Sequence, residues 1–183
     1  MLENIESLEL ARFYRDLLED VRTAAISNEE GGFREELFTK VAVDLLADGG
    51  ETESPRVTYD EKTTKAGVVQ HKINAHAISD NYETVDLFIS IFNDQESIKK
   101  LLKDEIDKAA RRVSAFFKNA YYGAHHKVID ESQEIFSFAE TLAHSRVLRE
   151  SIVRVNAFVI TDGLYNGKVP HPVVISGQKI EFK

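Results

Sequence analysis

The segment Glu83–Phe92 (ETVDLFISIF) constrains the fold most, because it places one carboxylate inside a run of apolar residues. Side chains of a strand alternate between its faces, which puts Val85, Leu87, Ile89 and Ile91 on one face and Asp86, Phe88, Ser90 and Phe92 on the other. A strand that is apolar on both faces is usually central and covered above and below. An ionised Asp86 is costly there unless it is paired, hydrogen-bonded or bound to a metal. Asp86 is therefore either a site residue at the open end of a sheet or a structural anchor.

Size and composition fit one soluble, cytoplasmic domain. A chain of 183 residues with 43% hydrophobic and 30% charged residues can bury a sizeable core. The absence of cysteine excludes disulfides and thiolate metal sites. No basic-then-apolar leader opens the sequence, and no apolar run approaches the roughly 18–20 residues that span a bilayer. We therefore expect no membrane partner.

Charge is unevenly distributed along the chain. The net charge is −8, and residues 1–66 carry all of it. The segment Lys99–Lys118 reverses the sign with seven basic residues against three acidic ones. This stripe is either the solvent side of an amphipathic helix or a surface for nucleic acid. The overall acidity argues against a dedicated nucleic-acid binder.

Hydrophobic periodicity and turn residues predict ten elements. Helices are expected at residues 3–25, 33–47, 93–121 and 130–150, and strands at 57–64, 68–78, 83–92, 153–161, 173–175 and 179–182. The first three strands form an antiparallel meander. This order predicts an α/β (α+β) fold with a restriction-endonuclease-like core, in which a mixed sheet containing the meander is flanked by helices.

Cores of this type hold a divalent metal between strand acids and a helical glutamate, with a lysine nearby. Here Asp86 and Glu36 (or its neighbour Glu35) are the candidate catalytic and metal-binding acids for Mg²⁺ or Mn²⁺. Lys72 on the adjacent strand is the candidate source of positive charge. The pattern is incomplete, because Phe88 stands where the acid-x-Lys element needs its lysine. A carboxylate that accepts backbone or side-chain donors is the structural alternative for Asp86.

The histidines predict no zinc site. His71 and His76 are five residues apart on one expected strand, so they should point to opposite faces. His125 and His126 follow a glycine, which favours a surface or capping role. None of these histidines has an acid at a zinc-binding spacing.

Several segments resemble the N-terminal domain of the AIPR (abortive infection phage resistance) family. The similarity rests on Phe33–Glu51 (FREELFTKVAVDLLADGGE), Tyr59–Lys62 (YDEK), Val85–Ser90 (VDLFIS) and Val159–Gly163 (VITDG). The similarity extends from about residue 30 to residue 183. Residues 1–28 form a helical prefix, and we expect residues 1–183 to form a single domain. The resemblance implies a bacterial phage-defence protein of several hundred residues, and the strand-like run Gln178–Lys183 also indicates the front part of a longer protein.

Three functions follow as hypotheses. The first is a nuclease-like module with a degenerate site that acts by recognition or assembly. The second is an active metal-dependent DNA or RNA endonuclease. The third is a dimerisation domain that forms a homo-oligomer through a sheet edge or the 131–150 helix.

Overall fold

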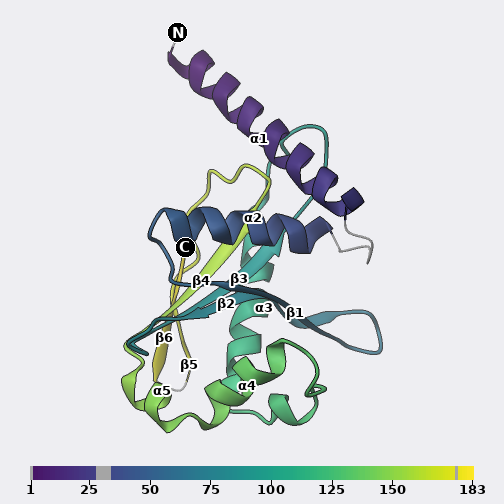
Figure 1. Cartoon of the computed structure of the whole chain (residues 1–183). Helices are drawn as coiled ribbons and strands as arrows, with labels where there is room; N and C mark the ends of the chain where they lie inside the picture. The colour runs from purple at the N-terminus through teal and green to yellow at the C-terminus, as the bar shows by residue number, and fades with distance from the viewer. Residues whose placement is uncertain (1, 28–33, 176) are drawn as a thin grey trace.

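A computed structural model describes residues 2–27, 34–175 and 177–183. The described residues form helices on both sides of a six-stranded sheet (Figure 1). The helices are α1 (Leu2–Ser27), α2 (Arg34–Asp48), α3 (Lys103–Tyr121), the short 3₁₀ helix η1 (His125–Lys127), α4 (Ile135–His144) and α5 (Arg146–Ser151). The strands are β1 (Arg56–Thr63), β2 (Val69–Ile78), β3 (Thr84–Ile91), β4 (Arg154–Thr161), β5 (Val173–Ile175) and β6 (Gln178–Phe182).

The sheet is mixed, with strand order β1-β2-β3-β4-β6-β5. Strands β1, β2 and β3 pair antiparallel, which confirms the predicted meander. The chain then crosses over through α3, α4 and α5, so that β4 pairs parallel to β3 along its whole length. Strand β3 is thus flanked by β2 and β4, and its residues 85–90 are buried. The apolar segment around Asp86 is the central strand that its pattern predicts.

Two apolar layers cover the sheet, one on each face. Helix α2 lies across one face, where a smaller core contains Val43, Ala75, Ala77, Phe88 and Phe158. Helices α3, α4 and α5 cover the other face and contribute to the larger core, together with Val85, Leu87 and Ile89 of β3. Because β3 faces a helical layer on each side, both of its faces are apolar.

Helix α1 is held from its middle onward and extends beyond the rest of the molecule at its N-terminal end (Figure 1). The Tyr14 hydroxyl donates to the carbonyl oxygen of Gln95 over 2.6 Å, and Arg22 pairs with Asp94 over 3.0 Å. Both partners lie in the connection that follows β3. Toward the free end, the side chain of Leu8 is 67% exposed.

The helix predicted at residues 93–121 begins only at Lys103. The carboxylate of Asp162, at the end of β4, explains the difference. It accepts the backbone N–H groups of Asn93 and Asp94 over 2.9–3.0 Å, and Asp94 has a positive φ of 48°. These hydrogen bonds hold residues 93 and 94 in a loop, so the first turns of the expected helix do not form.

The helix predicted at residues 130–150 is interrupted. It comprises α4 and α5, which are separated at Ser145. The backbone of Ser145 is extended, and its hydroxyl accepts from the N–H of Leu148 over 3.3 Å, as an N-cap does. A serine that caps a new helix ends the previous one.

Candidate functional site

Asp86 is enclosed by side-chain donors. Its side chain lies on the α2 face of β3, and the residue is 4% exposed. One carboxylate oxygen accepts the hydroxyl of Thr52 over 2.7 Å, and the other accepts the amide of Asn156 over 2.7 Å. Thr52 belongs to the connection between α2 and β1, and Asn156 belongs to β4. Asp86 therefore connects β3 to β4 and to the segment between α2 and β1 through hydrogen bonds. This is the arrangement expected if the carboxylate has a structural role.

A second polar cluster forms where α2 meets β2, and it centres on Glu35. Its carboxylate oxygen Oε1 accepts the ammonium group of Lys72 and, over 2.7 Å, the amide of Asn74. The side chain of Lys72 is only 10% exposed and that of Glu35 is 30% exposed. The side-chain oxygen Oδ1 of Asn74 in turn accepts a hydrogen bond from the backbone N–H of Ser90 on β3 over 2.9 Å. The pair of opposite charges is thus nearly enclosed between one helix and two strands.

The structure does not bring Asp86 and Glu36 together. Glu36 is exposed on α2, whereas its neighbour Glu35 contacts the sheet. Asp86 lies four residues before Ser90 on the same face of β3, which corresponds to roughly 13 Å along a strand. Lys72 contacts Glu35, and Asp86 contacts Thr52 and Asn156. Asp86 and Lys72 therefore belong to two separate clusters, and Glu36 lies exposed outside both of them.

His71 and His76 lie on the same side of the sheet, contrary to the sequence prediction. The ring of His71 packs nearly perpendicular to the ring of Phe116 on α3, and His76 stacks on Phe138 of α4 with 3.9 Å between ring centroids. The strand changes phase between these histidines, because Ile73 packs in the larger core and Ala75 in the smaller one. An irregularity in the pairing of β1 with β2 at this level accompanies the change.

The phase of β2 also places His71 beside Asp60 and His125. The Oδ2 atom of Asp60 lies 2.8 Å from Nε2 of His71 and 2.7 Å from Nε2 of His125. Burial opposes ionisation of the Asp60 carboxyl, but the hydrogen bonds to the two histidines outweigh it and lower its pKa to about 2. His125 and His126 are both buried, so the surface role predicted for them is wrong.

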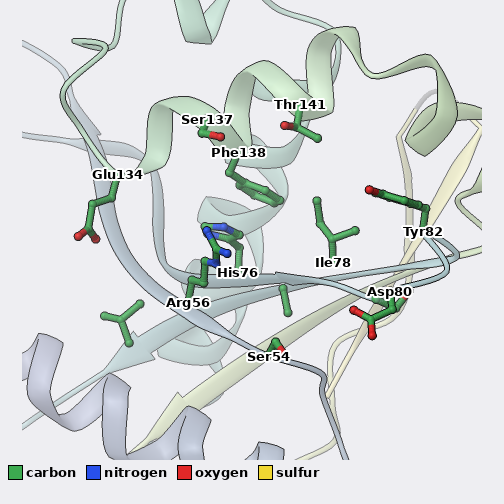
Figure 2. Close-up of a pocket in the computed structure, with 13 residues that line it drawn as sticks. Ser54, Arg56, His76, Ile78, Asp80, Tyr82, Glu134, Ser137, Phe138 and Thr141 are labelled. Carbon is green, nitrogen blue, oxygen red and sulfur yellow. The ribbon is translucent and has the colours of Figure 1, made fainter.

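A polar cavity of about 790 Å³ lies between the edge of the sheet and α4 (Figure 2). Figure 2 shows Arg56 and His76 beneath Ser137 and Phe138 of α4. Glu134 and Asp80 bring carboxylates to the same cavity. Burial, followed by the charge of Arg56, lowers the pKa of His76 to about 4. Because one cation, Arg56, and two carboxylates, Asp80 and Glu134, line this cavity, its charge favours no single class of ligand.

A basic groove runs along α3 on the larger-core side of the molecule. It has a volume of about 530 Å³, and its basic lining residues are Lys103, Arg111, Lys118, Lys168 and His171. The lining also contains Val169, Pro170 and Val173, so the floor is largely apolar. Asp107 is the acidic residue in the lining, and it pairs with Lys103 over 2.6 Å. The groove therefore presents uncompensated positive charge around an apolar floor.

Helical spacing in the sequence indicates that Glu35, rather than Glu36, is the acid of α2 that faces the sheet. Phe38 and Thr39 are the buried residues of the next turn, and Glu35 precedes them by three and four positions, which places it on the same face. Asp60 and His71 share a hairpin, so the sequence already brings them near each other. His125 joins them only through the packing of η1, and no local pattern indicates this contact.

Comparisons with known proteins identify one family. A family model described as the abortive infection phage resistance protein N-terminal domain matches residues 38–183. No curated protein and no solved structure shows a significant match to the chain. Within the described ranges, none of the helices combines the length and apolar character of a bilayer span. Because the family model covers about four fifths of the sequence, the chain belongs to the family of the abortive infection phage resistance (AIPR) protein N-terminal domain.

Proposed function

We propose that this chain is a non-cleaving nucleic-acid-recognition module of a phage-resistance protein, built on a restriction-endonuclease-like core with a degenerate site. The order of elements supports this proposal. Helix α2, the meander β1-β2-β3, a helical crossover and the parallel strand β4 follow one another as in such cores. The AIPR family supplies the biological setting, which is resistance to phage infection.

The surroundings of Glu35 support the absence of cleavage. A metal-dependent nuclease needs carboxylates that converge on the metal from the helix and from the strands. Here Glu35 comes from the helix, but the residues next to it on the strands are Asn74 and Ser90. The ammonium group of Lys72 already neutralises the one carboxylate. The cluster therefore lacks the negative charge that attracts Mg²⁺ or Mn²⁺.

The basic groove along α3 is the observation that supports nucleic-acid recognition. Its exposed cations Arg111 and Lys118 follow one helix face, and exposed Lys168, from the connection between β4 and β5, lines the same groove. Positive side chains spaced along a groove bind the phosphate backbone, and an apolar floor accepts the faces of sugars and bases. The groove lies on the opposite side of the sheet from Glu35, so binding there does not require the degenerate site.

We expect the purified protein to bind fluorescent DNA or RNA oligonucleotides in an anisotropy titration. The double variant Arg111→Ala/Lys118→Ala should weaken binding and reduce the slope of log K against log salt by about 2, because two phosphate contacts are lost. The exposed lysine Lys62 on β1 provides the control, and Lys62→Ala should leave both the affinity and the slope unchanged. In the same mixtures, Mg²⁺ or Mn²⁺ should cause no cleavage of the probe.

Two outcomes would contradict this proposal. Metal-dependent cleavage that disappears in Asp86→Asn or Glu35→Gln would show an active nuclease, with Asp86, Lys72 and a helical acid (Glu35 or Glu36) as candidates for its site. Absence of binding by the wild type, together with a dimer in light scattering, would favour assembly. An apolar groove of about 550 Å³ lined by Phe13, Leu17 and Leu45 is the observation that favours this second function.

The predicted contact surface at residues 131–150 is less suited to assembly. The large apolar side chains Ile135, Phe138, Leu142 and Leu148 of this region are buried in the molecule itself. Among the described residues of this region, Val147 is the one large apolar residue that is exposed. A homo-oligomer would therefore use the groove between α1 and α2 in preference to α4 and α5.

A further inference from the structure

The geometry points to a metal site that the sequence spacing does not reveal. We propose that Asp60, His71 and His125 bind one Zn²⁺ ion. The three residues come from β1, β2 and η1, and their potential ligand atoms all lie within 4.8 Å of one another. Both histidines direct the same nitrogen, Nε2, at the same carboxylate oxygen of Asp60. Three side chains from separate elements thus converge on one small volume.

The chemistry of the three donors fits zinc. Two imidazole nitrogens and one carboxylate oxygen are common protein ligands of Zn²⁺, and a water completes the tetrahedron when there are three protein ligands. Tetrahedral bonds of about 2.0–2.1 Å place ligand atoms roughly 3.3 Å apart. The present contacts of 2.7 and 2.8 Å therefore have to open by about half an ångström, which is within side-chain adjustment. The side chain of Asp60 is 14% exposed, which leaves a route for the ion and its water.

The surroundings of His71 provide the support that metal-bound histidines usually have. The side-chain amide of Asn119 on α3 lies 2.9 Å from Nδ1 of His71. When Nε2 binds the ion, the ring proton resides on Nδ1. The side-chain amide of Asn119, turned by 180°, then accepts a hydrogen bond from this N–H through its oxygen. The ring of Phe116 stands nearly perpendicular to the rings of both His71 and His125, at 5.7 and 5.8 Å between centroids, and it restricts their orientation. Asn119 is therefore a positioning residue for the site.

A bound ion would connect parts of the fold that are distant in the chain. It would join the hairpin of β1 and β2 to η1, in the connection that follows α3. This site lies on the side of the sheet that carries α3, whereas Glu35 and Asp86 lie on the α2 side. The proposal is thus independent of the recognition function and of the degenerate nuclease site.

The test is a metal-binding measurement on the whole chain. After treatment with EDTA, loading with Zn²⁺ and dialysis, we expect one ion per chain by mass spectrometry of the metal. His125→Gln and Asp60→Asn should lower the zinc affinity on the order of 100-fold or more, and Asn119→Ala about 10-fold, because outer partners also affect metal affinity. His144→Gln is the matched control, since His144 pairs with His126 at 3.0 Å outside the proposed site, and it should retain the ion.

A spectroscopic measurement on the wild type keeps the test independent of whether the variants fold. X-ray absorption of the zinc-loaded protein should show two imidazoles and at least one additional oxygen at distances of about 2.0–2.2 Å. A wild-type protein that retains no zinc after dialysis would overturn the proposal. So would a zinc ion with fewer than two imidazoles, or an ion lost in His144→Gln and retained in His125→Gln.

Discussion

Replacing Asp86 with alanine is expected to lower the free energy of unfolding by about 4 kcal/mol. The substitution leaves two buried donors, the Thr52 hydroxyl and the Asn156 amide, without their acceptor, and each costs about 1–3 kcal/mol. It also leaves a small cavity on the central strand. Urea denaturation followed by circular dichroism measures this loss as a lower transition midpoint.

Two comparisons show whether the carboxylate is structural. Asp86→Asn keeps a polar group of the same shape and should cost about 1–2 kcal/mol. Asp48→Ala removes an exposed acid at the end of α2 and should change the stability by less than about 0.5 kcal/mol. If the alanine variant at position 86 were as stable as the wild type or more stable, Asp86 would be a strained site residue and the structural interpretation would be wrong.

Acid is expected to destabilise the protein through His76. The histidine stacks on Phe138, and its Nδ1 atom is buried without a hydrogen-bond partner among the described residues. Burial and the charge of Arg56 lower its pKa from 6.5 to about 4. Between these two values the unfolded chain binds more protons than the folded one, so the free energy of unfolding falls as the pH falls. The contribution of this group amounts to about 3 kcal/mol between pH 7.5 and 4.

Denaturation curves at several pH values measure this contribution when the wild type is compared with His76→Gln. The variant has no titrating group at this position, so its stability should depend less on pH by about 3 kcal/mol over the same range. His171→Gln removes an exposed histidine and serves as the control substitution. Equal pH dependence in the wild type and His76→Gln would show that His76 is protonated as easily in the folded state as in the unfolded state.

Much of the fold is predictable from the sequence because its elements have strong local patterns. Strand β3 is apolar on both faces, and this marks it as central and covered on both sides. The helical period of α2 ends at Gly49, and Gly67 marks the turn between the first two strands of the meander. The resemblance to the AIPR family rests on short motifs in these same elements, and the family model confirms it.

The remaining differences have non-local causes. The late start of α3 depends on Asp162, which lies 69 residues after Asn93 and takes the N–H groups of the loop. The common face of His71 and His76 depends on a change of phase in β2, which an alternating pattern does not contain. The cluster of Asp60 with His125 spans 65 positions and forms only when η1 packs against the sheet. Local sequence patterns describe neighbouring turns and strands, and these contacts lie beyond that range.

A double-mutant cycle between Glu35 and Lys72 tests the central claim most directly, which is that a lysine and not a metal satisfies the helical carboxylate. The free energy of unfolding is measured for the wild type, Glu35→Gln, Lys72→Met and the double variant. Because both side chains are largely enclosed, each single substitution leaves an uncompensated charge, and we predict a favourable coupling energy of about 2 kcal/mol. A coupling energy near zero would contradict the account, since it would show that Lys72 does not stabilise the Glu35 carboxylate.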